Sequence, residues 1–195
     1  QQVQDYVQQC LGIAGSQSLQ QFGLQGGYAT LPQRNFAPLN TAFLLDNGRN
    51  VIAPLSDAEA GIARSAEARF RNCVDAWKAL KGATVEELSQ PAIKVVLGPR
   101  EAVFKMDFHF YVNRLDERWE FTQFVQNVPT MMLPALNAAN ATIDSQLRNE
   151  GLINLDALPP TSITFFPIKK TLVAVISSFE GLLRDREYFV FANAR

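Results

Sequence analysis

Apolar residues recur at three- and four-residue spacing in two stretches of the first half of the chain, which predicts two amphipathic helices. The first is expected over residues 1–22 and the second over residues 56–81. The second helix opens with "SDAE", where Ser56 and Glu59 have the spacing of a capping box. The apolar stripes consist of Val3, Tyr6, Val7, Cys10, Leu11 and Ala14 in the first helix and of Ile62, Ala66, Phe70, Cys73, Trp77 and Leu80 in the second.

Turn-forming residues dominate the connection between these helices, residues 28–55, and predict an extended segment. The turn "DNG" at 46–48 predicts a short hairpin whose strands lie around residues 43–45 and 51–52. After the second helix, "TVEELS" at 84–89 has the spacing of a further capped helical turn.

The second half of the chain alternates between apolar and polar residues, which is the period of a half-buried strand. The run "AVFKMDFHFY" at 102–111 predicts such a strand, and "RWEFTQFV" at 118–125 predicts the return strand of a hairpin. The apolar face of the first strand consists of Phe104, Met106, Phe108 and Phe110, and its polar face of Lys105, Asp107, His109 and Tyr111.

A third helix is expected over residues 129–150, and two more strands follow it. The first of these strands runs from "SITFF" into "KKTLVAVISS" at 162–178, and the second is "EYFVFANA" at 187–194. This order predicts an α+β fold in which the two N-terminal helices pack with a four-stranded antiparallel sheet, β-β-α-β-β along the chain. We expect residues 1–55 to form the first helix and its Pro-rich connection, and residues 56–195 the α+β body, as one compact unit.

Composition places the chain among ordinary globular proteins, with 47% hydrophobic and 19% charged residues. The net charge of −1 and the lack of a block of like charges give no electrostatic attraction to nucleic acid or to an anionic membrane. No apolar run approaches the roughly 20 residues that cross a bilayer. The chain begins with Gln1 and carries no signal peptide, so we expect a mature protein or a trimmed ectodomain.

Gly26 and Gly27 raise the question of a phosphate-binding loop. Such loops follow a strand and open a helix, so that amide groups and the helix N-terminus face the anion. Here the glycines follow a predicted helix and lead into an extended segment, and neither GxGxxG nor GK[ST] is present. We therefore predict that Gly26 and Gly27 terminate the first helix.

Cys10 and Cys73 are the two cysteines of the chain, and each lies on the apolar stripe of a predicted helix. Two helices that pack through these stripes could join them in a disulfide. Equally, both could be reduced and act as small buried hydrophobic residues. Without CxxC spacing or a cluster of further ligands, a zinc site is not expected, and we expect no cofactor.

The segment "VQDYVQQCLGIAGSQSLQQFGLQGGYATLP" resembles a family of archaeal membrane-anchored surface proteins. That family combines a YVxxC helix, about a dozen residues and an LGxQGGY motif, here FGLQGGY, before an extended segment that contains proline. The runs "EARFRNCVDAW", "AVFKMDFHFYVN" and "YFVFANAR" resemble the second cysteine-bearing helix, the first long strand and the closing strand of the family, in the same order.

The resemblance implies a compartment rather than a reaction. Proteins of this kind carry an N-terminal transmembrane helix, sometimes with a pilin-like signal, just before the YVxxC helix. That helix is absent from this chain, so the resemblance implies membrane contact only through an anchor missing here. It also implies an oxidising space outside the membrane, and in that space a disulfide between Cys10 and Cys73. It brings no catalytic residues.

His109 is the single histidine, so a Ser-His-Asp, Cys-His or histidine-containing metal site would have to use it. It shares the polar strand face with Lys105, Asp107 and Tyr111, which is either a functional groove or a solvated or covered sheet face. No GxSxG motif accompanies it. Asn140 begins an N-glycosylation sequon, Asn140-Ala141-Thr142, within the third predicted helix.

Three functions are compatible with these features. The first is a non-enzymatic ectodomain of a membrane-tethered surface protein, which acts in recognition, adhesion or assembly, for example as a pilin-like subunit. Its partner would be another protein or a second copy at the cell surface. The second is an extracytoplasmic module that binds or senses a small ligand in a pocket between sheet and helices. The third, ranked last, is a hydrolase that uses His109 and nearby carboxylates.

Overall fold

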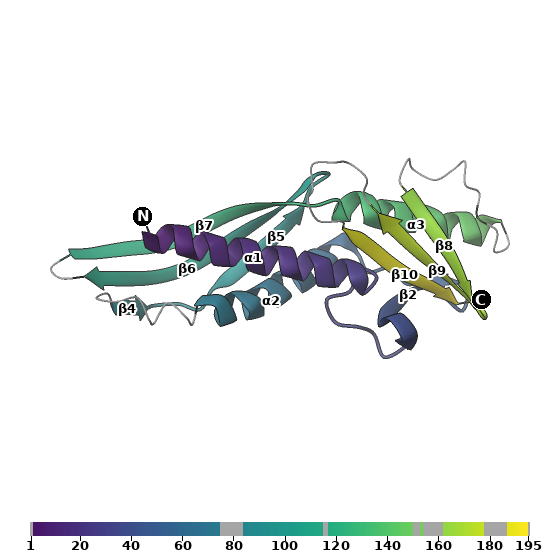
Figure 1. Ribbon diagram of the computed structural model, residues 1–195, viewed down its shortest axis with the longest axis horizontal. Coiled ribbons are helices and arrows are strands. Elements are labelled where there is room, and N and C mark those ends of the chain that lie inside the picture. The colour runs from purple at the N-terminus through teal and green to yellow at the C-terminus, as the bar shows by residue number, and fades with distance from the viewer. Residues whose placement is uncertain are drawn as a thin grey trace.

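The protein is elongated, with one sheet at each end and a long helix that runs alongside both (Figure 1). The computed structural model describes residues 2–74, 84–114, 117–149, 153, 162–177 and 187–194. Within these ranges the fold is α+β, with three α-helices and two sheets. The helices are α1 (Gln2–Leu24), α2 (Leu55–Val74) and α3 (Met132–Arg148), and a 3-10 turn, η1, spans Ala37–Leu39.

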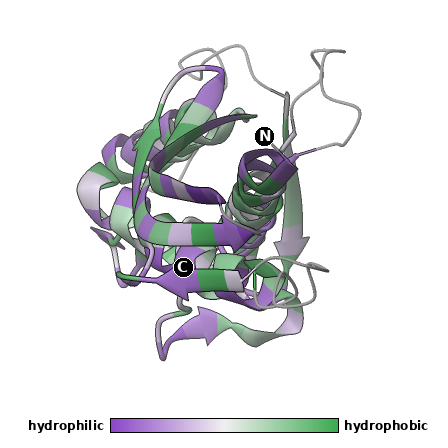
Figure 2. Cartoon of the chain, turned by 90° about the vertical axis from the view of Figure 1, so that its left-hand side faces the viewer, coloured by the Kyte–Doolittle hydropathy of each residue, from purple (hydrophilic) through white to green (hydrophobic). Residues whose placement is uncertain are grey.

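A four-stranded sheet is built on the long hairpin of β6 and β7, which was predicted from the alternating pattern. Its strands are β4 (Thr84–Glu87), β5 (Ala92–Leu97), β6 (Glu101–Arg114) and β7 (Glu117–Pro129). Strands β4 and β5 pair in succession along the same side of β6, and β7 pairs along the other side. Hydrophilic and hydrophobic residues alternate along these strands, as the end-on view in Figure 2 shows.

A six-stranded sheet forms the other end of the molecule, in the order β1-β2-β10-β9-β8 with β3 paired to β2. Its strands are β1 (Asn35–Phe36), β2 (Thr41–Asp46), β3 (Arg49–Asn50), β8 (Ser162–Ile168), β9 (Thr171–Ser177) and β10 (Tyr188–Ala194). The pair of β2 and β10 is parallel, and the other pairs are antiparallel. The parallel pair joins segments from opposite ends of the sequence.

Helix α1 packs along α2 and contacts both β7 and β10, so it belongs to both ends of the molecule. Gly15 allows the close approach to the four-stranded sheet, since a Cβ atom there would lie 2.9 Å from the Phe104 ring. Gly23 does the same at the other sheet, where a Cβ atom would lie 2.5 Å from the Tyr188 carbonyl oxygen. The apolar face of β6, predicted as Phe104, Met106, Phe108 and Phe110, is buried beneath the helices.

The predicted single four-stranded antiparallel sheet is wrong, because the strands divide between two sheets and one of these is mixed. Residues 162–178 were expected to form one strand but form β8 and β9, joined by a turn at Lys169 and Lys170. Lys169 adopts a φ of 55°, which a reading of apolar periodicity does not detect. The predicted hairpin at the "DNG" turn is present as β2 and β3, with Asn47 and Gly48 in the left-handed region, but its second strand is Arg49–Asn50 and not residues 51–52.

Two further expectations fail around the edge of the four-stranded sheet. Residues 84–87 form β4 rather than a capped helical turn, and β5 was not anticipated. The predicted capping box is wrong as well, because α2 begins at Leu55 and Ser56 lies inside the helix, while Glu59 accepts a hydrogen bond from the Leu97 amide, 2.9 Å away. The remainder of the predicted second helix, residues 75–81, lies outside the described residues.

Candidate functional site

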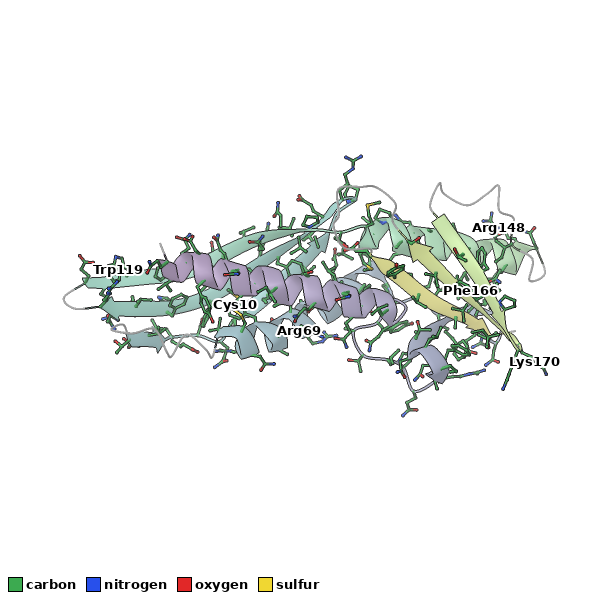
Figure 3. The ribbon with its side chains drawn as sticks, viewed as in Figure 1. Cys10, Arg69, Trp119, Arg148, Phe166 and Lys170 are labelled. Atoms are coloured by element: carbon green, nitrogen blue, oxygen red, sulfur yellow. A yellow bond between two sulfur atoms is a disulfide. The ribbon has the colours of Figure 1, made fainter. Side chains whose placement is uncertain are left out.

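A disulfide joins α1 to α2 between Cys10 and Cys73, with a Cα–Cα distance of 5.7 Å. This confirms the pairing that the sequence left open and that the resemblance favoured. Cys10 is buried, and the Tyr6 hydroxyl donates a hydrogen bond to the Cys73 carbonyl oxygen at 2.9 Å, which adds a polar contact beside the sulfur bridge. Figure 3 shows the bridge where the two helices lie side by side.

Gly26 and Gly27 follow α1 after one intervening residue, Gln25, and have φ values of +73° and +84°. The Gly27 amide donates to the Phe22 carbonyl oxygen at 2.9 Å, which ends the helix by a backbone hydrogen bond. A Cβ atom on Gly26 would lie 3.0 Å from Thr41 Oγ1 and 3.1 Å from the Val190 carbonyl oxygen. The glycines therefore combine a left-handed backbone with close packing of the helix end on β2 and β10.

The polar face of β6 lies on the outer side of the four-stranded sheet, opposite the buried phenylalanines. His109 Nε2 lies 2.8 Å from Glu120 Oε1 on β7, and Gln123 donates to Asp107 at 3.0 Å. The structure thus brings His109 to a glutamate of the neighbouring strand rather than to Asp107. Lys105 lies on the same face and is exposed, opposite Val125 of β7.

Tyr111 belongs to a second group nearer the tip of the hairpin. The Arg118 guanidinium lies 3.6 Å from the centre of the Tyr111 ring, and one of its nitrogens lies 3.4 Å from Glu86 Oε2. The centres of the Tyr111 and His109 rings lie 5.5 Å apart. These residues form cross-strand pairs, which stabilise an antiparallel sheet by a few tenths of a kcal/mol each, up to about 1 kcal/mol.

The described residues of this face place no nucleophile beside His109, which a hydrolase of the Ser-His-Asp or Cys-His type would need. Both cysteines are in the disulfide. Ser89 Oγ accepts a hydrogen bond from the His109 backbone amide at 2.9 Å, not from the imidazole. Among the described residues, no hydroxyl group lies within hydrogen-bond distance of the His109 ring, so the arrangement shown is a histidine–carboxylate pair on a sheet surface.

The free edge of the four-stranded sheet is β7, which pairs only with β6 among the described strands. It is 13 residues long and mostly exposed. Beside this edge, the outer face carries Val125, which is 51% exposed, and on the far strand β5 it carries Val96, which is 53% exposed. Trp119 lies near the tip of β7, as Figure 3 shows, and is 41% exposed. Alternation predicted this strand but not that its outer edge would be unpaired.

Glu187, the residue before β10, links the segment after β7 to the six-stranded sheet and was not singled out from the sequence. Its carboxylate accepts hydrogen bonds from the Met131 amide at 2.7 Å and from the Thr130 hydroxyl at 3.0 Å, just before α3. Burial raises the pKa of this carboxyl, and the two hydrogen bonds lower it by less. Burial therefore disfavours the charged form, so the contribution of Glu187 to stability falls as pH rises above the ordinary glutamate range.

A groove of about 560 Å³ lies between the C-terminal half of α1, η1 and α2, and it is open to solvent. Carboxamides dominate its walls, and it contains one charged side chain, Arg69 of α2 (Figure 3). Its lining consists of Gln17, Gln20, Gln21, Leu24, Gln25, Leu39, Asn40 and Arg69. The glutamine-rich pattern of the first helix could have drawn attention to it, but only the packing of α2 adds the arginine.

Asn140, the predicted glycosylation residue, lies within α3. Its side-chain nitrogen donates to the Leu136 carbonyl oxygen at 3.2 Å, and its oxygen lies 3.5 Å from the Asn50 amide nitrogen. The side chain is thus engaged with the helix and with β3, and glycosylation of Asn140 stays a prediction.

Within the described ranges, no three His, Cys, Asp or Glu residues are grouped closely enough to hold a metal ion. Across the same residues, none of the helices has the length and apolar character of a membrane-spanning segment. No family model matches this chain, and neither a curated protein nor a solved structure does.

Proposed function

We propose that this chain is a non-enzymatic, extracytoplasmic domain of a membrane-tethered surface protein, and that it acts in surface assembly by pairing the edge of β7 with a second copy. The disulfide supports the compartment, because structural disulfides persist in oxidising spaces and are rare in the cytosol. The tether is supported by the resemblance of the YVxxC and FGLQGGY segments to anchored surface proteins.

The unpaired edge of β7 carries the proposal. An edge strand presents a row of free N–H and C=O groups that can pair with a strand of another chain. Monomeric proteins commonly blunt such edges by keeping them short or by placing proline within them. Here the strand is 13 residues long, and its one proline, Pro129, is the last residue. The disulfide-braced pair of α1 and α2 supports the sheet from its other face.

Lysine substitution at two valines tests this surface. Val125→Lys places a charge on β7 beside the proposed junction, whereas Val96→Lys places the same charge on β5, at a site of equal exposure on the same outer face. We expect the native chain to dimerise with rising concentration in sedimentation-velocity ultracentrifugation. We expect Val125→Lys to weaken the dimer at least about tenfold, or about 1.4 kcal/mol, and Val96→Lys to leave it unchanged.

Two results would contradict this assembly role. A native chain that remains monomeric up to about 1 mM would exclude useful self-association, since a millimolar constant corresponds to only about 4 kcal/mol. Equal weakening by both lysines would assign the contact to the outer face of the sheet instead of to the β7 edge.

The other two functions have less support. A ligand-binding module is favoured by one observation, the carboxamide-lined groove, although this groove lies among helices rather than between sheet and helices. A hydrolase that uses His109 remains the weakest proposal, because the described residues bring a glutamate but no nucleophile to its ring.

A further inference from the structure

Arg69 in the carboxamide-lined groove faces neutral partners. Its two terminal nitrogens donate to Gln17 Oε1 at 3.3 Å and to Gln21 Oε1 at 2.5 Å. Among the described residues no carboxylate lies within ion-pair distance of it, whereas Arg34, Arg71 and Arg118 each pair with one. The groove thus holds a cation that no carboxylate of the described ranges neutralises.

The orientation of the two glutamines follows from this contact. Gln17 and Gln21 are four residues apart on α1, so they lie on the same face of the helix and grip the guanidinium together. Because their oxygens accept from Arg69, the NH₂ group of Gln17 remains as a donor, and the NH₂ group of Gln21, whose nitrogen also donates to Gln25 Oε1 at 3.4 Å, keeps one further N–H. A guanidinium has five N–H donors and no acceptor, so at least one wall of the groove is rich in donors. Such a wall suits anionic oxygen atoms.

The remainder of the lining suits a ligand with several hydroxyl groups. Gln20 and Asn40 add two carboxamides, each of which can donate and accept, whereas the Gln25 carboxamide is engaged with its neighbours in the chain. Leu24 and Leu39 are 44% and 47% exposed and provide apolar contact at the margin. A ligand that suits this lining has several hydroxyl groups, C–H groups that can contact the leucines, and one carboxylate. An acidic monosaccharide combines these features.

We propose that this groove binds a carboxylated saccharide, such as a uronic acid residue of a glycan, with its carboxylate on Arg69 and its hydroxyls on the surrounding carboxamides. The guanidinium forms charge-assisted and often bidentate hydrogen bonds with a carboxylate, which are the strongest single contacts in such a site. The proposal is independent of the β7 edge, because the groove is built from α1, η1 and α2.

A titration followed by ¹H–¹⁵N NMR tests the site with D-glucuronate as the probe. We expect saturable shifts of the side-chain amides of Gln17 and Gln21 and of the Arg69 Nε resonance. Glucose, which lacks the carboxylate, should bind at least about tenfold more weakly, the loss of roughly one charge-assisted hydrogen bond. N-acetylalanine, which has the carboxylate but no hydroxyls, should also bind at least about tenfold more weakly, because it leaves the other carboxamides without ligand contacts.

Variants of two arginines on α2 locate the effect. Arg69→Gln should abolish the glucuronate shifts, and Arg69→Lys should keep part of the affinity, because it retains the charge without the planar fork. Arg64→Gln, an exposed position of the same helix outside the groove, should bind as the native chain does. The unchanged backbone spectrum of each variant away from the groove serves as the control for folding.

Three results would overturn the proposal. Shifts that are absent at saturating glucuronate would remove the site altogether. N-acetylalanine binding as tightly as glucuronate would reduce the groove to a carboxylate or peptide C-terminus site. Equal losses in Arg69→Gln and Arg64→Gln would show a general effect of charge and not recognition at this groove.

Discussion

Gly26 meets two separate demands at the end of α1. Its φ of +73° lies in the left-handed region, where a side chain costs about 1–2 kcal/mol. The space around it is also closed by the Thr41 hydroxyl and by backbone atoms of β2 and β10. Gly48, in the β2–β3 turn, has nearly the same φ of +71° but has no atom within 4 Å of its Cβ direction.

This contrast allows the two contributions to be separated. Gly48→Ala should lower the free energy of unfolding by about 1–2 kcal/mol, the backbone cost alone. Gly26→Ala should lower it by clearly more, about 3 kcal/mol or above, because backbone atoms at 3.1–3.2 Å cannot move aside as a flexible side chain would. Urea denaturation of both variants measures the difference. Equal losses would show that packing at the helix end contributes little.

The roles of some individual residues could be predicted from the sequence, and those of others could not. The glycines at the end of α1 and the left-handed turn at Gly48 were predictable from local patterns, because glycine is the residue that most readily adopts the positive φ that such chain reversals require. Arg69 and Glu187 could not be singled out, because each acquires its role from segments more than 40 residues away. The local pattern of a single sequence does not reveal contacts between such distant segments.

At the scale of elements, α2 covers the outer edge of β5 with two carboxylates. Glu67 accepts from the Ile93 amide at 2.7 Å, and Glu59 accepts from the Leu97 amide at 2.9 Å. Eight residues of helix rise about 12 Å, and four residues of strand rise about 13 Å, so the two spacings match. The helix thus pairs alternate donors of an edge strand that would otherwise be open to another chain.

Removal of one carboxylate should show how much the fold depends on these hydrogen bonds between α2 and β5. Glu67→Ala leaves the half-buried Ile93 amide without its acceptor and should lower the free energy of unfolding by about 1–3 kcal/mol. Glu67→Gln keeps a side-chain oxygen acceptor and should lose less than half as much. Denaturant titration of the pair gives the comparison. A loss in Glu67→Gln as large as that in Glu67→Ala would attribute the effect to charge instead.

The elements themselves were predictable to different degrees. The helices and the β6–β7 hairpin have long and regular apolar periods, which dominate their local structure. Strands β4 and β5 are short, and their pairing with β6 outweighs the capping signal of "TVEELS". The parallel pairing of β2 with β10 lies beyond local patterns, because Phe43 and Ala192 approach only in the folded chain.

At the scale of the whole molecule, α1 connects the two sheets, and the disulfide anchors the part of it that lies beside the four-stranded sheet (Figure 3). The bridge closes a loop between residues 63 positions apart, which restricts the unfolded chain and stabilises the fold by about 4 kcal/mol in the chain-entropy model.

Loss of the bridge should therefore act unevenly across the molecule. The double variant Cys10→Ala/Cys73→Ala should be less stable by about 4 kcal/mol. Native-state hydrogen exchange should rise mainly in the first half of α1 and in α2, and should change little in β9 and β10. Uniformly faster exchange would show instead that the two ends unfold as one cooperative unit.

The position of the bridge also has a mechanical consequence. In Figure 1 the N-terminus lies in the left-hand part of the long axis, behind the tip of the β6–β7 hairpin, and the C-terminus lies near the right-hand end, so tension applied through them would load the molecule lengthwise. The covalent link between Cys10 and Cys73 prevents the extension of a 63-residue segment, which is about 210–230 Å of contour at about 3.3–3.6 Å per residue. If the chain is stretched between its termini, this segment can extend only after the sulfur–sulfur bond is reduced.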